Sequence, residues 1–186
     1  MARLNTSEAA RNLVIETIGG RRTPRIRVES DMFTEGTGIP DANSAYGDGL
    51  SPGLRWSEPP SGTRSIALVA EDPDAPQPTP ATHWLLYNLP GTATEVPGSI
   101  PKNPRLPQFE GAAQGRAWNG TIGYAGPQPP RDDRAHHYHF EVFCLDSSLN
   151  LPPGATRSDL MRSMSGHVLA KGELVGLYEA PARSDR

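Results

Sequence analysis

Three short stretches of the sequence carry side chains that could do chemistry, and the first is acidic. Glu71-Asp72-Pro73-Asp74 follows a continuous apolar run at residues 66–70. Pro73 fixes its own φ and biases Asp72 toward an extended conformation, so the two aspartates are expected on a stiff turn at the rim of the core. A carboxylate in such a place could raise the pKa of a neighbouring imidazole. Taken alone, the stretch is more typical of an ordinary surface turn, because Asp-Pro commonly initiates turns.

Histidines define the other two stretches. His83 precedes Trp84 at the start of an apolar segment, and by itself it is more typical of a structural histidine than of a ligand. The third stretch, residues 136–146, has the pattern of a strand, in which successive side chains point to opposite faces. This alternation predicts that His136 and Tyr138 face inward at the mouth of the core. The opposite and wetter face is expected to carry His137, His139 and Glu141.

This alternation also bears on metal and nucleophile chemistry. It separates the neighbouring histidines, so a zinc site is not expected, and no other metal or cofactor site is indicated. Cys144 lies deep in the same strand and is expected to be a small core residue rather than a nucleophile. A Ser-His-Asp set stays possible, but the sequence has no Gly-x-Ser-x-Gly elbow.

Composition narrows the class of protein. A chain of 186 residues suits one domain, and 19 glycines with 20 prolines indicate many turns between short strands. The net charge of −3 argues against general nucleic-acid binding. No apolar run approaches the roughly 18 residues of a transmembrane helix. One cysteine and an N-terminus without the apolar core of a signal peptide predict a cytoplasmic protein.

The elements that must position these residues are mostly strands. Alternating or continuous apolar patterns predict strands at residues 25–29, 65–70, 84–87, 136–145 and 174–178. A helix over 7–18, followed by a glycine-rich linker, is expected to form an arm outside the main body. A second helix is expected from an N-cap at Ser158 to Gly172, and residues 97–130 are expected to lack regular structure. The fold class is therefore mainly β, a sandwich or barrel with peripheral helices.

In their order and spacing these segments resemble the phosphatidylethanolamine-binding protein family, in particular its bacterial Raf-kinase-inhibitor-like branch. The match runs from Ile26 to Tyr178. It comprises the family's segments S-P-x-L-x-W, D-P-D-A-P…H-W and G-Y-x-G-P-x-P-P…H-[RH]-Y, together with its closing helix and strand. The matching residues are Ser51-Pro52-Gly53-Leu54-Arg55-Trp56, Asp72-Pro73-Asp74-Ala75-Pro76 with His83-Trp84, Gly123-Tyr124-Ala125-Gly126-Pro127-Gln128-Pro129-Pro130 with His136-His137-Tyr138, and Gly166-His167-Val168-Leu169-Ala170 with Leu174-Val175-Gly176-Leu177-Tyr178.

The resemblance implies a Greek-key β-sandwich with a small cavity near one end that binds small anions and phosphorylated head groups. Carried over position by position, the ligand-binding residues are Asp72, Asp74, His83, Gly126, His136 and Tyr138. The histidines, the tyrosine hydroxyl and an amide near Gly126 are expected to donate to the anion, with the aspartates favouring charged histidines. His137 stands where many members have arginine, which removes a permanent charge. The resemblance thus implies domain boundaries at 1–22 (helical arm and linker), 23–180 (binding domain) and 181–186 (tail).

The leading hypothesis is a non-catalytic binding protein for a small phosphorylated or carboxylated ligand. The alternative is a protein-interaction module of the kinase- or protease-inhibitor type, which would use the cavity rim and the 97–130 loop. An esterase-like enzyme with His and Asp as general acid and base is a third reading, for which no nucleophile is identifiable. A protein partner and a homodimer are both possible.

Overall fold

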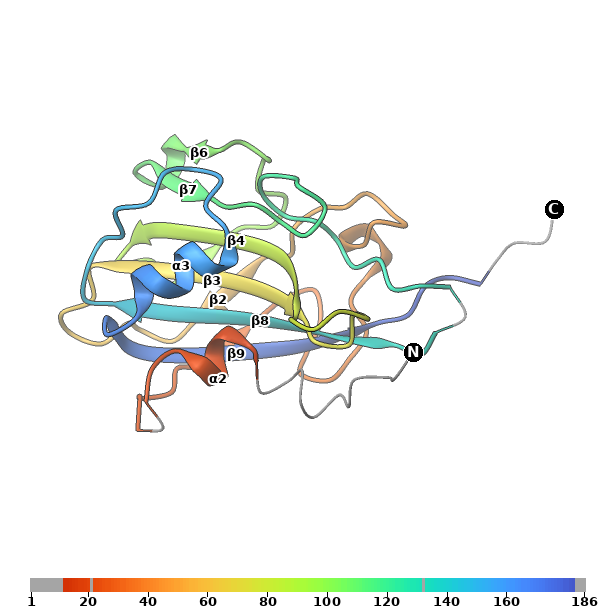
Figure 1. Ribbon diagram of the computed structural model, residues 1–186, viewed down its shortest axis with the longest axis horizontal. Coiled ribbons are helices and arrows are strands. Elements are labelled where there is room, and N and C mark those ends of the chain that lie inside the picture. Colours follow the sequence, from red (N-terminus) through yellow and green to blue (C-terminus); the bar gives the residue numbers. More distant parts are fainter. Residues whose placement is uncertain (1–11, 21, 132, 183–186) are drawn as a thin grey trace.

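Two antiparallel sheets form a β-sandwich in the computed structural model, which describes residues 12–20, 22–131 and 133–182 (Figure 1). The larger sheet has the order β6-β7-β4-β3-β8-β9, and the smaller has the order β1-β2-β5. The predicted fold class, a mainly β Greek-key sandwich with peripheral helices, is confirmed. No helix among the described residues is both long and apolar enough to cross a lipid bilayer.

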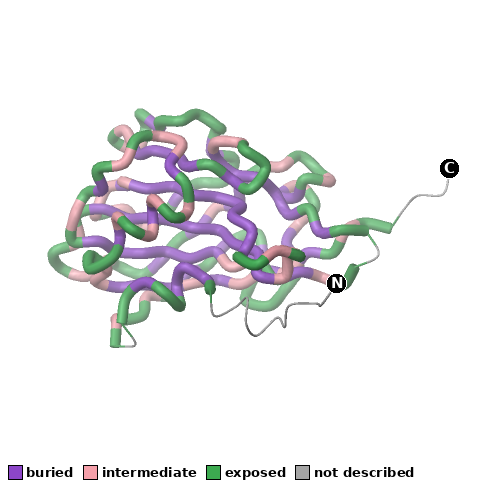
Figure 2. Tube along the Cα trace, in the orientation of Figure 1, coloured by how far each residue is buried: buried purple, intermediate pink, exposed green. Residues whose placement is uncertain are grey.

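Continuous apolar segments form the centre of the larger sheet. β3 is buried along its whole length, and its neighbours on both sides are nearly as buried (Figure 2). Burial on both faces explains why these segments lack simple polar–apolar alternation. The strands are β3 (Ser65–Asp72), β4 (Ala81–Pro90), β6 (Arg105–Leu106), β7 (Ala112–Gln114), β8 (His136–Leu145) and β9 (Val168–Tyr178). β3 and β4 thus continue beyond the expected strands and include the acidic and histidine positions.

The smaller sheet encloses the sandwich core against one face of the larger sheet. Its short strands are β1 (Val28–Glu29), β2 (Leu54–Trp56) and β5 (Glu95–Val96). Trp84 lies fully buried in this core with its ring edge against Tyr124, at a centroid distance of 5.6 Å. The indole N–H of Trp84 donates to Gln114 Oε1 over 2.8 Å. Gln114 in turn donates to the carbonyls of Pro101 and Asn103, so a single buried amide joins the core to the long loop.

A second apolar cluster covers the other face of the larger sheet, where α2 (Val14–Thr17) and α3 (Arg157–Met164) lie (Figure 1). The expected C-terminal helix is shorter than predicted. Thr156, rather than Ser158, caps it through a capping box with Asp159, and the helix ends at Met164. Val168 and Leu169 were expected on the helix but lie in β9, because Gly166 at a φ of +82° turns the chain before them.

The N-terminal residues differ most from the expectation. Residues 7–11 of the helix expected over 7–18 lie outside the described residues, and the remainder forms only the four-residue α2. The picture of an arm outside the main body is wrong for residues 13–18, since Leu13, Val14 and Ile15 are buried in the second apolar cluster. The proposed division of the chain at residues 22 and 180 stays a prediction.

The loop at 97–130 is less irregular than expected. It contains β6, β7 and the 3₁₀ helix η2 (Pro107–Phe109), and a second 3₁₀ helix, η1 (Asp41–Asn43), lies earlier in the chain. β7 pairs with β4 through Leu86 and Tyr87, so this stretch extends the larger sheet. The part of the loop that forms β6 and β7 is therefore one edge of the larger sheet.

The facing predicted for residues 136–145 is confirmed at the start of β8. His136 and Tyr138 are buried, whereas His137 is exposed and His139 is partly exposed. Glu141 is the exception, because it lies on the predicted wetter face yet is fully buried. The N-terminal segment covers this part of the face, and no periodicity within the strand could indicate that cover.

Candidate ligand-binding site at one end of the sandwich

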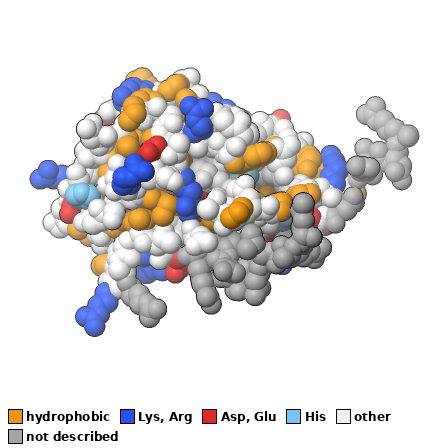
Figure 3. Space-filling model, viewed as in Figure 1, with side chains coloured by type: hydrophobic (Ala, Val, Ile, Leu, Met, Phe, Trp, Pro, Cys, Tyr) orange, Lys and Arg blue, Asp and Glu red, His pale blue; other side chains and the backbone are white. Residues whose placement is uncertain are grey.

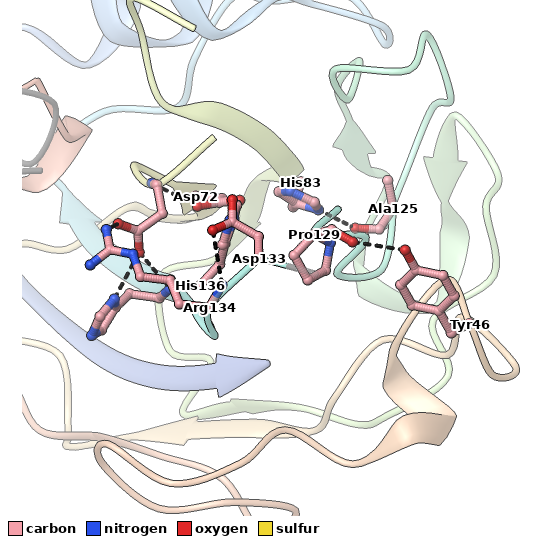
Figure 4. Close-up of polar contacts among 10 residues, drawn as sticks. Tyr46, Asp72, His83, Ala125, Pro129, Asp133, Arg134 and His136 are labelled. Carbon is pink, nitrogen blue, oxygen red and sulfur yellow. Dashed lines mark hydrogen bonds and ion pairs between the residues drawn. The ribbon is translucent and has the colours of Figure 1, made fainter. Parts of the chain in front are cut away.

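A buried aspartate–histidine pair forms the centre of the candidate site. β3 and β8 run antiparallel, so β3 ends at Asp72 close to where β8 begins at His136. Asp72 Oδ2 lies 2.8 Å from His136 Nδ1, and both side chains are almost completely buried (Figure 4). This contact joins two of the three stretches that the sequence singled out.

His136 is a cation-forming group in this setting. Burial opposes its charge, but the hydrogen bond and negative charge of Asp72 outweigh burial, so the pKa of His136 is raised. Nε2 of the same ring lies 3.5 Å from Asp133 Oδ2, a half-exposed carboxylate at the rim. The ring therefore has one nitrogen fixed by Asp72 and the other directed toward Asp133 (Figure 4).

His83 reaches the site through a β-bulge. Ala70 pairs with Trp84 and Glu71 pairs with Thr82, so β4 has one extra residue, His83, at this point. His83 Nδ1 lies 2.7 Å from the carbonyl oxygen of Ala125, which can only accept, so Nδ1 carries the proton and Nε2 is an acceptor. Burial lowers the pKa of His83. Of the two histidines that the aspartates could charge, His136 is therefore the one favoured as a cation, whereas burial favours the neutral ring of His83.

Tyr138 presents a buried hydroxyl beside His83. Their rings meet edge to face at a centroid distance of 5.1 Å. The Tyr138 hydroxyl is fully buried and makes no hydrogen bond of normal geometry with the described residues, although the Asp72 carboxylate and the Gln128 backbone lie near it. Burial and the nearby Asp72 charge raise its pKa, so the group stays protonated. A protonated hydroxyl without a partner is a donor available to a ligand.

Asp74 has a different environment from Asp72. Its carboxylate accepts from the backbone N–H of His137 at 2.9 Å, from His137 Nδ1 at 2.7 Å and from Arg134 Nη2 at 2.7 Å. Burial raises the pKa of Asp74, but the hydrogen bonds from His137 outweigh it, and the net shift is downward. The backbone N–H of Asp74 donates to Asp72 Oδ1 at 2.8 Å. Asp74 thus fastens the acidic turn to the start of β8, and direct contact with a ligand stays a prediction.

Gly126 lies next to the His83 partner Ala125 and is buried. A Cβ at this position would lie 2.7 Å from backbone atoms of Asn43, Ser44 and Ala45. Glycine is therefore required for close packing of the 123–130 stretch on the 43–45 backbone. This contact is with protein rather than with a ligand, so the close approach has a structural cause.

Several residues around the site were not singled out by the sequence. Tyr46 donates to the carbonyl of Pro129 at 2.7 Å (Figure 4). The Arg131 guanidinium lies 4.8 Å from the centre of the Tyr46 ring. Trp118 is half exposed, with its ring 6.3 Å from that of His83. Asp133 completes the rim. They occur in segments without periodicity, so only the folded chain brings them to the site.

Two surface hollows lie away from these residues. One, of about 510 Å³, is lined by Arg25, Arg27, Glu29, Arg55, Trp56 and Ser57, and a second, of about 160 Å³, lies beside β2 and β5. The ligand pocket at the predicted residues therefore stays a prediction, although their side chains do converge. Among the described residues, no three His, Cys, Asp or Glu side chains come together as a metal site.

By its architecture the protein is an antiparallel two-sheet sandwich, with a polar cluster where the ends of β3, β4 and β8 meet. The chain belongs to the phosphatidylethanolamine-binding protein family, whose model matches residues 29–179. The sequence is 42% identical over 161 residues to a UPF0098 protein of Pyrococcus horikoshii, covering 87% of this chain and 80% of that protein.

Solved structures agree with this assignment. A putative phosphatidylethanolamine-binding protein homologue from Chlamydia trachomatis superposes with a TM-score of 0.75 at 34% identity, covering 84% of this chain and 99% of that chain. YbcL of E. coli, described as a member of the mammalian family, gives a TM-score of 0.79 at 29% identity with the same coverage of both chains. The family suggested by the sequence motifs is confirmed.

Proposed function

We propose that this protein is a non-catalytic binding protein for small oxyanions, namely phosphate or a phosphorylated head group, held at the Asp72–His136 end of the sandwich. The observation that carries the proposal is the buried charged pair beside a buried tyrosine hydroxyl that lacks a partner. Unpartnered buried donors are rare in folded proteins and a ligand would satisfy this one. The name of the family, which refers to a phosphorylated lipid, supports the same class of ligand.

Each side chain has a distinct role in this proposal. The His136 imidazolium supplies the positive charge and donates from Nε2, while the Tyr138 hydroxyl donates from inside the site. Neutral His83 accepts at Nε2, so it suits a protonated oxygen of a phosphate monoanion or an N–H group of the ligand. Asp72 sets the charge of His136, and this division of roles explains why an anion site contains a carboxylate.

Anion affinity should depend on pH and on the inward-facing histidines. Because the pKa of His136 is raised, binding is expected below that pKa and should be lost as pH rises through it. His136→Ala should weaken sulfate binding about 10- to 100-fold, as expected for a lost hydrogen bond to a charged ligand. His83→Ala should weaken binding of the phosphate monoanion but not of sulfate, because sulfate has no proton to donate to His83 Nε2. Calorimetric titration with inorganic sulfate measures this, because sulfate keeps one charge state from about pH 5.5 to about pH 9, across the histidine range.

His139→Ala is the matched control. His139 lies on the opposite face of β8, where Nδ1 bonds Glu173 at 3.0 Å. Its replacement should leave sulfate binding unchanged. Affinity that stays constant across the pH range, or a loss of binding in His139→Ala alone, would contradict the proposed facing and the role of His136.

The rim carboxylate Asp133 should favour ligands that carry an ammonium group. Its position 3.5 Å from His136 Nε2 places a negative charge near the expected anion, which repels free phosphate but attracts an adjacent ammonium. O-Phosphoethanolamine is therefore expected to bind several-fold more tightly than inorganic phosphate at the same pH. Asp133→Asn should reduce that ratio toward one in paired titrations. A ratio near one in the unmodified protein would argue for free oxyanions as the ligands.

A further inference from the structure

The outer face of the larger sheet carries a second polar cluster, separate from the candidate ligand site. We call Glu71, Glu141, Arg157 and Lys171 the outer-face cluster. Glu71 and Glu141 are fully buried, and Arg157 donates to both carboxylate oxygens of Glu71. Glu71 precedes Asp72 in β3, so the two side chains point to opposite faces of the same sheet.

The outer-face cluster holds the N-terminal segment, residues 13–18, at both ends. At its start, the backbone N–H of Val14 donates to Glu71 Oε2 and that of Ile15 to Glu141 Oε2, each at 2.9 Å. At its end, Lys171 Nζ donates to the carbonyls of Ile15 at 2.5 Å and Ile18 at 2.9 Å. These contacts satisfy backbone groups that a four-residue helix leaves unpaired.

Apolar side chains of the same segment complete the contact. Leu13, Val14, Ile15 and Ile18 are buried against the second apolar cluster, which includes Val69 and Phe143 of the sheet. In Figure 3, which views this face, apolar side chains are visible between the charged ones. The segment precedes residues 29–179, the part matched by the family, and Gly19 and Gly20 connect it to the body. The segment therefore lies before the part matched by the family model and closes over a polar cluster.

One atom of this arrangement is left unsatisfied. Glu141 Oε1 is buried and has no hydrogen-bond partner in the described residues. Charged groups of both signs lie around Glu141 on β3, β8, β9 and α3. Those neighbours are Glu71 on β3, His139 on its own strand, Lys171 and Glu173 on β9, and Arg157 on α3. The N-terminal segment contacts Glu141 through backbone groups and apolar side chains, and the charge of its Glu16 acts on Lys171.

We propose that the outer-face cluster is a proton-controlled docking site for the N-terminal segment, which holds residues 13–18 while Glu141 is protonated and releases them when Glu141 ionises. A carboxylate at Glu141 would have one oxygen without any donor, under a segment that excludes water. Release of the segment lets water reach both oxygens. It also uncovers the apolar surface around Val69 and Phe143.

The direction of the pH effect follows from the docked state. Burial, together with the charges of Glu71 and Glu173, raises the pKa of Glu141 well above its ordinary value. A group with a raised pKa in the docked state favours docking at low pH. The docking equilibrium then weakens by about tenfold per pH unit between the ordinary pKa of glutamate and the docked one.

Amide hydrogen exchange on the full chain tests the proposal, with exchange rates corrected for the intrinsic effect of pH. The protection of the Val14 and Ile15 amides should fall by about tenfold per unit as pH rises. Amides of Phe143 and Cys144, near the C-terminal end of β8 and paired with strands on both sides, should keep their protection over the same range. Protection of Val14 and Ile15 that does not change with pH, or that changes in parallel with the β8 amides, would overturn the proposal.

Glu141→Gln separates the proton effect from packing. Glutamine has nearly the shape of the protonated acid and cannot ionise, so the pH dependence of protection at residues 14 and 15 should fall well below tenfold per unit. What remains is the contribution of Glu71, whose pKa burial also raises. The control is Glu95→Gln on the exposed face of β5, which should retain the full pH dependence. A pH dependence that is undiminished in Glu141→Gln would overturn the proposal, and the β8 amides show in the same sample whether the variant is folded. If the Glu141→Gln variant is not folded, the pH dependence of exchange in the unmodified protein alone tests the proposal.

Discussion

Asp72→Asn should remove most anion binding near neutral pH. The substitution preserves the shape of the side chain but removes the negative charge that lies 2.8 Å from His136 Nδ1. Without Asp72, burial is opposed only by Asp133 and Asp74, so the pKa of His136 should fall and less of the ring should carry a positive charge. The loss of one charge-assisted hydrogen bond predicts about 10- to 100-fold weaker binding of inorganic sulfate by calorimetry.

The chain offers a closely matched control for this variant. Asp146 lies 2.8 Å from His167 Nδ1, the same contact in an exposed position far from the candidate site in the sheet. Asp146→Asn should leave sulfate affinity unchanged. At pH 5.5, about one unit below the ordinary pKa of histidine, the Asp72→Asn variant should bind sulfate more tightly than at neutral pH. The lower pH favours the charged form of His136 and so restores part of the lost affinity. Equal affinity of Asp72→Asn and the unmodified protein at neutral pH would rule out His136 as the charged donor.

Trp84→Ala should cause the largest loss of stability of any single change in the core. Deletion of a fully buried tryptophan costs about 3–5 kcal/mol through lost contacts and the cavity that remains. Gln114 Oε1 also loses its donor, which adds about 1–3 kcal/mol for a buried acceptor. The sum is comparable with the whole free energy of unfolding of a typical domain, about 5–15 kcal/mol. Urea unfolding monitored by circular dichroism measures the change.

Trp118→Ala provides the comparison within the same residue type. Trp118 is 50% exposed, so its removal should change the free energy of unfolding by only about 0.5 kcal/mol. Similar losses in the two variants would mean that the buried Trp84–Gln114 contact does not join the core to the long loop as described. The Trp118 variant also shows whether the indole at the rim affects sulfate binding.

The sequence predicted the framework of the site because strands have a simple period. Alternation alone placed His136 and Tyr138 inward at the start of β8, and the structure agrees. The family was recognisable because its short motifs keep their order and spacing. Strand lengths were less accessible, since β9 begins at Val168, where an apolar pattern suits a helix and a strand equally.

Chemistry inside the site was harder to predict than position. The charge of His83 depends on a bulge that turns the ring toward the Ala125 carbonyl, and a bulge has no reliable signal in one sequence. Gly126 was expected to admit a ligand, whereas its neighbour in space is the 43–45 backbone. Glu141 looked exposed because the segment that covers it is more than a hundred residues away in the chain.

Consecutive residues of β3 point to opposite faces of one sheet. Glu71 binds the N-terminal segment on the outer face, and Asp72 binds His136 inside the sandwich. A shift of β3 by one residue relative to its neighbours would exchange the two carboxylates, moving the longer acid into the sandwich and the shorter one outside. Insertions or deletions in this strand therefore cannot be neutral for either face. Insertions or deletions between Asp72 and His83 must therefore lie in the turn that begins at Pro73. Only in that turn can natural or designed variants change the sequence distance between these two site residues.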